Sequence, residues 1–230
     1  TWKTKEYIVN TKILPYFGKI KMNEITSITI IHWQNELMEK RDDKGQKYSP
    51  TYLRTIHAQL SSLLNHACKY YNLKTNAARD VGSMGEKEAN EMLFWTQDEY
   101  EKFISAIKDK PQSFYAFEIL YWCGLRIGEL FALTKEKFDF ENNIVKVDQS
   151  VQKLNGETVI TPPKTKKSIR TIVMPEFLSR EIQEYLSGFY KLKDKDLIFP
   201  ISKSYLHHEM DRGCKKASVK RIRVHDLRHS

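Results

Sequence analysis

The stretch IVKVDQSVQKLNGETVITPPKTKKSIRTIVM, residues 144–174, determines the fold class. Its apolar residues tend to alternate rather than recur at helical spacing, which predicts half-buried strands. We expect one strand to begin at Ile144 and two more to span residues 158–161 and 169–174. Asn155-Gly156 is a hairpin turn signal, and residues 162–167 are expected to join the last two strands as a second hairpin. The stretch therefore predicts a small antiparallel sheet.

Helical patterns flank this sheet on both sides. Thr96 and Glu99 have the spacing of a capping box at a helix start, and a later helix is expected to stop at Gly124. Another helix is predicted over about residues 126–133, and helices resume at Pro175. Because the strands are gathered between helices instead of alternating with them, the expected fold is α+β, mainly α with a small antiparallel sheet.

The first half of the chain has a helical pattern. An apolar stripe near the N-terminus is expected to end at Pro15, because proline breaks a helix interior. Ser49-Pro50 predicts a helix start, with serine as the N-cap and proline in the first turn. The apolar positions expected to face the core are Ile28, Ile31 and Leu37 in one helix and Leu53, Ile56, His57, Leu60, Leu63, Leu64 and Ala67 in the next.

The composition changes after residue 79, where glycines, a serine and acids leave little to bury. Such a segment is typical of a linker between domains. We therefore expect a helical domain over residues 1–79, a linker over 80–92 and a mixed domain over 93–230.

The positive charge of the chain is concentrated in a few zones. The net charge is +9, residues 212–228 contain seven basic residues and one acid, and residues 158–171 contain four basic residues and no acid. A charged run is often only a solvated face, but clustered Lys and Arg attract phosphates. The charge indicates a polyanionic partner, which could be DNA, RNA or an acidic membrane surface, and the pattern of zones favours nucleic acid. The residues expected to contact it are Lys166, Lys167, Arg170, Lys215, Lys216, Lys220, Arg221 and Arg223.

Several classes of protein are excluded by the sequence. Three separated cysteines argue against a disulfide framework, and no apolar run is long enough to span a membrane. There is no Gly-rich phosphate loop or dinucleotide fingerprint. No metal site is expected, because His207-His208 lacks the spacing of a zinc protease helix. The chain opens at Thr1 without a methionine, so we expect the natural start to precede it.

Three segments contain residues suited to phosphoryl chemistry. Arg126 follows a glycine at a helix start, where a guanidinium and backbone N–H groups can hold a phosphate; the alternative is an ordinary Arg126–Glu129 pair. Lys164 lies between two predicted strands, where the alternative is a lysine protecting a sheet edge. His225 and Arg228 share one helical face and suit acid–base work on a phosphoryl group; the alternative is a basic helix on the DNA backbone.

In this order, these segments resemble the tyrosine recombinase family, close to the integrases of phages and conjugative transposons. The resemblance covers nearly the whole chain and implies a SAM-like core-binding DNA-binding domain over 1–79 and a catalytic domain over 93–230 that is incomplete at its C-terminus. The matching stretches are Pro15-Tyr16-Phe17-Gly18, Leu93-Phe94-Trp95-Thr96 with Glu99, Gly124-Leu125-Arg126-Ile127-Gly128-Glu129-Leu130, Pro163-Lys164-Thr165 with Ser168 and Arg170, and His225-Asp226-Leu227-Arg228-His229.

The resemblance implies a site-specific DNA recombinase that cuts and rejoins DNA through a 3′-phosphotyrosine intermediate, integrating or excising a mobile element. No cofactor and no metal are implied. The nucleophilic tyrosine is expected beyond Ser230, so this chain alone is not expected to cleave DNA. The implied catalytic residues are Arg126, Lys164, His225 and Arg228, with Glu129 and His229 in support.

The implied partners are double-stranded DNA at core recombination sites, further copies in a tetrameric synaptic complex and an accessory directionality factor. The implied location is the bacterial cytoplasm, at the nucleoid and not at a membrane. Two alternatives stay open: a non-catalytic, sequence-specific DNA-binding relative, and a type IB topoisomerase-like enzyme. The complete set of implied catalytic residues argues against the first, and the compact first domain and the arginine segment favour recombination over the second.

Overall fold

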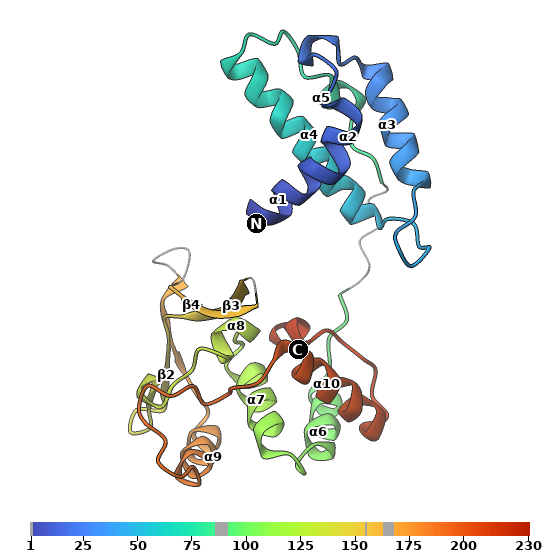
Figure 1. Ribbon diagram of the computed structural model, residues 1–230. Helices are drawn as coiled ribbons and strands as arrows, with labels where there is room; N and C mark the ends of the chain where they lie inside the picture. The colour runs from blue at the N-terminus through green and yellow to red at the C-terminus, as the bar shows by residue number, and fades with distance from the viewer. Residues whose placement is uncertain (1, 86–91, 155, 163–167) are drawn as a thin grey trace. The chain divides into compact units, whose positions relative to one another are not determined.

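The computed structural model contains two compact units, Thr1–Asn90 and Glu91–Ser230, which we call unit 1 and unit 2 (Figure 1). Unit 1 is helical where it is described, and unit 2 combines helices with two small antiparallel sheets. The predicted class, mainly α with antiparallel strands, is therefore confirmed. The described residues are 2–85, 92–154, 156–162 and 168–230.

The first helices of unit 1 follow one another without a break. Pro15 lies in the first turn of α2, where the N–H that proline lacks is not needed by the helix. The predicted end of the helix at Pro15 is therefore wrong. The elements of unit 1 are α1 (Trp2–Ile8), the π-helical turn η1 (Val9–Ile13), α2 (Leu14–Phe17), the 3-10 turn η2 (Met22–Glu24), α3 (Ser27–Glu39), α4 (Pro50–Tyr70) and α5 (Ala77–Val81).

The helix α4 begins as the sequence predicts. The Ser49 side chain accepts a hydrogen bond of 3.3 Å from the backbone N–H of Tyr52, which satisfies one of the free donors at the helix start. Leu63 is 36% exposed, so this one predicted core position is wrong. The core positions that are confirmed are Leu53, Ile56, His57, Leu60, Leu64 and Ala67.

The apolar face of α3 differs from the prediction. Leu37 is buried, but Ile28 and Ile31 are 68% and 43% exposed. Ile30 and Trp33 face the core instead, because they lie seven and four residues before Leu37 and share its side of the helix. Because α3 contains several apolar residues, the sequence alone did not determine which side of the helix faces the core.

Part of the expected linker packs on unit 1. Met84 is buried in the core of unit 1, and the backbone carbonyl of Gly82 accepts a hydrogen bond of 2.9 Å from Gln34 Nε2. Residues 80–85 therefore belong to unit 1. Residues 86–91 lie outside the described residues.

Unit 2 begins with the capping box that the sequence predicts, formed by Thr96 and Glu99 at α6. α7 ends at Trp122, just before Gly124, as expected. The helix predicted over residues 126–133 is shorter, because α8 is a single turn. The elements are α6 (Gln97–Ala106), α7 (Pro111–Trp122), α8 (Ile127–Leu130), the 3-10 turn η3 (Lys135–Lys137), β1 (Phe138–Asp139), β2 (Ile144–Val147), β3 (Ser150–Leu154), β4 (Glu157–Thr161), β5 (Arg170–Val173), α9 (Glu176–Ser187), α10 (Lys203–Ala217) and the 3-10 helix η5 (Val224–His229).

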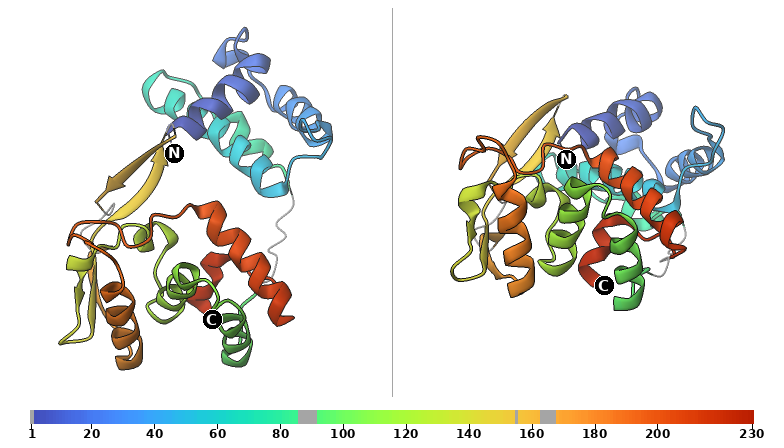
Figure 2. Two further views of the ribbon diagram at one scale, coloured as in Figure 1. Left: turned by 60° about the horizontal axis from the view of Figure 1, so that its bottom comes forward. Right: turned by 90° about the horizontal axis from the view of Figure 1, so that it is seen from below.

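The strands of unit 2 form two separate antiparallel sheets. One has the order β1-β2-β5 and the other is the β3–β4 ribbon. Ser150 pairs with Thr161 and Leu154 with Glu157, so the first predicted hairpin is confirmed by the pairing on either side of residues 155–156. The ribbon contacts α8 through β3 and projects away from α9 (Figure 2).

The second predicted hairpin is wrong. β4 pairs with β3, and β5 pairs with β2, where Ile172 lies opposite Val145 and Arg170 opposite Val147. This pairing places β5 beside the two buried valines of β2, and alternation along one strand does not specify its partner. β4 and β5 therefore belong to different sheets, and residues 163–167 between them lie outside the described residues.

The helices of unit 2 pack around a single core. Trp95, Phe103 and Phe117 are almost completely buried within it. α10 approaches α6 closely at Gly213, where a Cβ atom would lie only 2.7 Å from Ile107 Cγ2. This core fixes α8, β5 and η5, which carry the site described next.

Candidate active site

Arg126 lies at the start of α8, directly after a sharp turn. Gly124 has a φ of +58°, a conformation that glycine adopts without strain, and Leu125 is buried beside it. The backbone N–H of Arg126 donates to Glu129 Oε2 at 2.9 Å, and Arg126 Nη1 donates to Glu129 Oε1 at 2.9 Å. The Arg126–Glu129 pair considered from the sequence is thus present, and the Arg126 side chain is still 55% exposed.

Glu129 is held by a second arginine from a distant strand. Arg170, at the start of β5, donates from Nη1 to Glu129 Oε1 at 3.0 Å and from Nη2 to Oε2 at 2.8 Å. Burial raises the pKa of Glu129, but the hydrogen bonds from Arg170 and Arg126 outweigh it and lower the pKa to about 2. The carboxylate is therefore charged at neutral pH and is shared by two guanidinium groups.

Arg228 lies close enough to Arg126, Arg170 and Glu129 for their charges to change its pKa. Burial lowers the pKa of Arg228, the charges of Arg126 and Arg170 lower it further, and the charge of Glu129 opposes them. Arg228 is half-buried in η5. The structure therefore brings the two predicted arginine segments together, although they are about a hundred residues apart in the sequence.

The two histidines of η5 are exposed and lie beside each other. The rings of His225 and His229 make an edge-to-face contact with centroids 6.1 Å apart. η5 is anchored by Leu227 in the core and by Asp226, whose Oδ2 accepts from Arg223 Nε at 2.8 Å. The helix thus presents both imidazoles to solvent from a fixed backbone.

Most of the basic residues predicted to contact DNA are paired with acids inside unit 2. Lys216 Nζ lies 3.5 Å from Asp109 and Lys220 Nζ lies 3.1 Å from Glu99. Arg221 pairs with Asp211, and Arg223 pairs with Asp226. Among the described residues, Lys215 makes no ion pair, and its side chain is exposed. The predicted residues Lys164, Lys166 and Lys167 lie outside the described residues.

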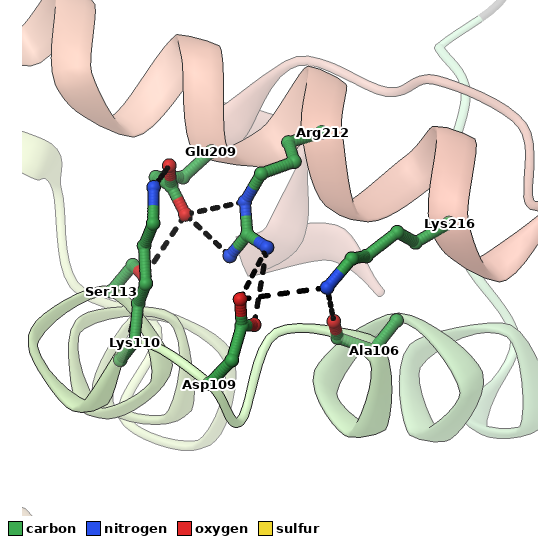
Figure 3. Close-up of polar contacts among 7 residues, drawn as sticks. All are labelled: Ala106, Asp109, Lys110, Ser113, Glu209, Arg212 and Lys216. Carbon is green, nitrogen blue, oxygen red and sulfur yellow. Dashed lines mark hydrogen bonds and ion pairs between the residues drawn. The ribbon is translucent and has the colours of Figure 1, made fainter.

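A second arginine–glutamate network joins α10 to the turn between α6 and α7 (Figure 3). Arg212 donates to Glu209 at 2.7 Å and to Asp109 at 2.9 Å. Lys110 Nζ also donates to Glu209, at 2.6 Å, and the Glu209 side chain is only 5% exposed. No pattern in the sequence indicates this network, because its two halves are about a hundred residues apart.

A pocket of about 940 Å³ opens beside Arg126. Its walls come from α8, the β3–β4 ribbon and residues 197–203, with Phe131, Val151 and Phe199 among the lining residues. The described part of the chain contains no cluster of three or more metal-ligating side chains. It also contains no helix with the length and apolar character needed to cross a membrane.

The sequence matches two family models. Residues 94–230 match the model described as the phage integrase family, and residues 1–38 match the phage integrase N-terminal SAM-like domain. The ICEBs1 integrase of Bacillus subtilis is 30% identical over 245 residues, which cover 100% of this chain and 64% of that protein. The integrase of Mycobacterium phage L5 is 23% identical over 227 residues, which cover 94% and 58%. The chain thus spans less than two thirds of the length of these curated relatives.

Solved structures share the fold. The integrase of transposon Tn1549 in complex with a circular intermediate DNA superposes with a TM-score of 0.78 at 21% identity, covering 99% of this chain and 77% of that chain. A lambda integrase tetramer bound to a Holliday junction gives a TM-score of 0.65 at 17% identity, covering 98% and 61%. The match of residues 94–230 to the phage integrase model shows that the chain belongs to the phage integrase family of tyrosine recombinases.

Proposed function

We propose that this chain is the DNA-binding and catalytic part of a site-specific recombinase that integrates or excises a mobile element. It would cut and rejoin double-stranded DNA through a 3′-phosphotyrosine intermediate. The observation that carries the proposal is the Glu129 carboxylate held between Arg126 and Arg170, with Arg228 near enough for their charges to lower its pKa. Two guanidinium groups share this carboxylate and a third carries charge nearby, so the site has positive charge to spare for a phosphate.

The proposed chemistry assigns a role to each group. A tyrosine oxygen attacks the phosphorus and forms the phosphotyrosine bond while the bond from phosphorus to the 5′ oxygen breaks. Arg126 and Arg228 bind the non-bridging oxygens, on which negative charge develops. Lys164 gives a proton to the departing 5′ oxygen, and His225 takes the proton of the attacking hydroxyl.

Two residues support these groups without receiving a proton. Glu129 fixes the orientation of Arg126, and the contact between the His229 and His225 rings limits the positions of His225. The bond energy of the DNA backbone is kept in the phosphotyrosine link, so the proposed reaction needs no nucleotide cofactor.

Four tyrosines of unit 2 are engaged in packing with one another, which supports a nucleophile outside this chain. The Tyr100 hydroxyl donates to Glu118 at 2.9 Å, and its ring stacks on Tyr121 at 3.5 Å. Tyr115 packs on Tyr185 with ring centroids 4.2 Å apart. Among the described residues, no tyrosine hydroxyl is hydrogen-bonded to Arg126 or Arg228. We therefore propose that the tyrosine lies beyond residue 230.

The proposed partner is double-stranded DNA carrying the core recombination sites. Four copies would act together in the synaptic complex, as in the lambda integrase tetramer bound to a Holliday junction. An accessory directionality factor would bias the reaction toward integration or excision. We place this action in the bacterial cytoplasm, at the nucleoid.

The experiment is to trap the covalent intermediate on a nicked suicide substrate. The DNA carries a core site with a nick close to the cleavage position, so that the released fragment diffuses away and religation fails. A denaturing gel then reports any protein–DNA adduct. The longer natural protein should give an adduct, and residues 1–230 alone should bind the same DNA and give none.

Each contrary result has a definite meaning. An adduct with residues 1–230 would return the search for the nucleophile to the twelve tyrosines of this chain. DNA binding without any adduct from the longer protein would favour a non-catalytic relative. Relaxation of supercoiled DNA without joining of two sites would favour a topoisomerase.

A further inference from the structure

We infer that Arg170 is a positioning residue for Arg126, acting through Glu129, and is not a DNA contact. This inference rests on the proposed function, because it concerns the guanidinium group that would bind the phosphate. The sequence places Arg170 in a basic, acid-free stretch and predicts that it contacts DNA. The structure gives its guanidinium a different use.

The guanidinium of Arg170 is occupied by Glu129. Its two terminal nitrogens donate to the two carboxylate oxygens at 3.0 and 2.8 Å, in the parallel geometry of a bidentate pair. The Arg170 side chain is 28% exposed, whereas that of Arg126 is 55% exposed. Arg126 uses one side-chain N–H on Glu129 and keeps other donors for a ligand.

The carboxylate oxygen that holds Arg126 also holds Arg170. Glu129 Oε1 accepts from Arg126 Nη1 at 2.9 Å and from Arg170 Nη1 at 3.0 Å. A carboxylate bound at both oxygens by Arg170 has little freedom to rotate, so it presents Oε1 to Arg126 in one direction. A single ion pair between Arg126 and Glu129 would not impose this restriction, since the exposed arginine would be free to move.

Arg170 also preserves the charge of the site. Glu129 alone would neutralise Arg126 and reduce its attraction for a phosphate. The second guanidinium offsets the negative charge of Glu129, so the group keeps a surplus of positive charge. Arg170 therefore contributes to both the direction and the charge of Arg126 without touching the DNA.

The test separates binding from chemistry in the full-length protein. For Arg170→Met, we measure the rate of adduct formation at saturating suicide DNA and the Kd for the same DNA at several salt concentrations. We expect the rate to fall by about 10- to 100-fold, because small misplacements of a catalytic group cost this much. The Kd should change by less than about threefold and the salt slope should stay the same. Arg170→Lys keeps the positive charge but loses the planar fork of the guanidinium group. Its rate of adduct formation should therefore lie between those of the unsubstituted protein and Arg170→Met.

Two matched controls distinguish positioning from general stability and from DNA contact. Arg212 is 25% exposed and pairs with Glu209, which is 5% exposed, and these values are close to those of Arg170 and Glu129. Arg212→Met should therefore cost comparable stability and leave the rate at saturating DNA within about threefold. Lys215→Met removes an exposed charge and is the control for a DNA contact: it should raise the Kd and reduce the salt slope, which Arg170→Met should not do.

A double-mutant cycle tests the route through Glu129. If Arg170 acts on Arg126 only through this carboxylate, Arg170→Met should cost less than about threefold in rate when Glu129→Gln is already present. Additive losses would mean that Arg170 acts in another way.

Several results would overturn the inference. A normal rate at saturating DNA, with weaker binding and a salt slope reduced by about one, would make Arg170 a phosphate contact. An equal loss of rate in Arg212→Met would reduce its role to general stability. A full-length protein that forms no adduct even without substitution would overturn the proposed function and this inference with it.

Discussion

The indole nitrogen of Trp95 donates a hydrogen bond of 2.8 Å to the backbone carbonyl of Lys220, 125 residues away in the sequence. The backbone N–H of Trp95 donates to Ser230 Oγ at 2.9 Å. One buried residue thus holds both ends of the segment that contains His225 and Arg228. The position of the second arginine segment depends on a tryptophan to which we assign no chemical role.

Replacing Trp95 by phenylalanine should destabilise unit 2. Trp95→Phe keeps an aromatic ring in the core but leaves the Lys220 carbonyl without this donor, which typically costs about 1–3 kcal/mol. Urea unfolding followed by circular dichroism measures the change. As a control, Trp2→Phe alters a side chain that is 76% exposed and should stay within about 0.5 kcal/mol. An unchanged unfolding free energy for Trp95→Phe would contradict the prediction.

Replacing Arg126 by lysine should separate DNA binding from cleavage. Arg126→Lys keeps the charge but loses the planar fork that can bind Glu129 and a phosphate together. We expect a normal fold, binding within a few-fold of the original, and a rate of adduct formation lower by a factor of about 100 to 1000 in the longer protein. The suicide-substrate gel measures the rate. Cleavage at a nearly normal rate would remove Arg126 from the active site.

Replacing Glu129 by glutamine should change how stability depends on pH. The pKa of Glu129 is lowered from 4.5 to about 2 in the folded protein, so the charged carboxylate stabilises the fold above pH 4.5. This stabilisation is lost as the pH falls toward 2, and its size is about 3 kcal/mol. Glu129→Gln lacks this stabilisation by a charged carboxylate. The difference in unfolding free energy between the unsubstituted protein and Glu129→Gln should therefore shrink from pH 5 to pH 2. Urea unfolding at each pH tests this, and a constant difference would contradict it.

The exposed and paired lysines should contribute differently to DNA affinity. Lys215 is exposed without an ion pair among the described residues, whereas Lys216 lies 3.5 Å from Asp109. If Lys215 contacts a phosphate, Lys215→Met should lower the slope of log Kd against log salt by about 0.9. Lys216→Met should lower it by less, because part of its charge is already compensated. Binding isotherms at four salt concentrations measure both slopes, and equal changes would contradict the expected order.

Several local signals in the sequence predicted local structure, although the helix end expected at Pro15 was wrong. The helix starts at Ser49 and at Thr96 depend on contacts within four residues, so the residue types alone specify them. The β3–β4 pairing follows from the Asn155-Gly156 signal in the sequence, which is flanked by alternating residues. The segments containing Arg126 and Arg228 were also identifiable, because each has a compact pattern of its own.

Contacts between distant residues could not be predicted in the same way. Arg170 is 41 residues from Glu129, and nothing in its basic neighbourhood indicates an acidic partner. Charge counts along the chain likewise missed Asp109 and Glu99, which neutralise lysines more than a hundred residues later. The predicted partner of β5 was wrong for the same reason, because the pattern of a strand does not specify its neighbour.

The division of β4 and β5 between two sheets has a consequence for how this chain tolerates insertions. β4 pairs with β3 and β5 pairs with β2, so β4 and β5 do not pair with each other although they follow one another in the sequence. Extra residues after Pro162 would therefore leave the register of both ladders unchanged, whereas extra residues at 155–156 would strain the short hairpin connection between β3 and β4. We expect both ladders to keep their register when the spacing between β4 and β5 changes, whereas the β3–β4 ladder requires the spacing between Leu154 and Glu157 to be kept.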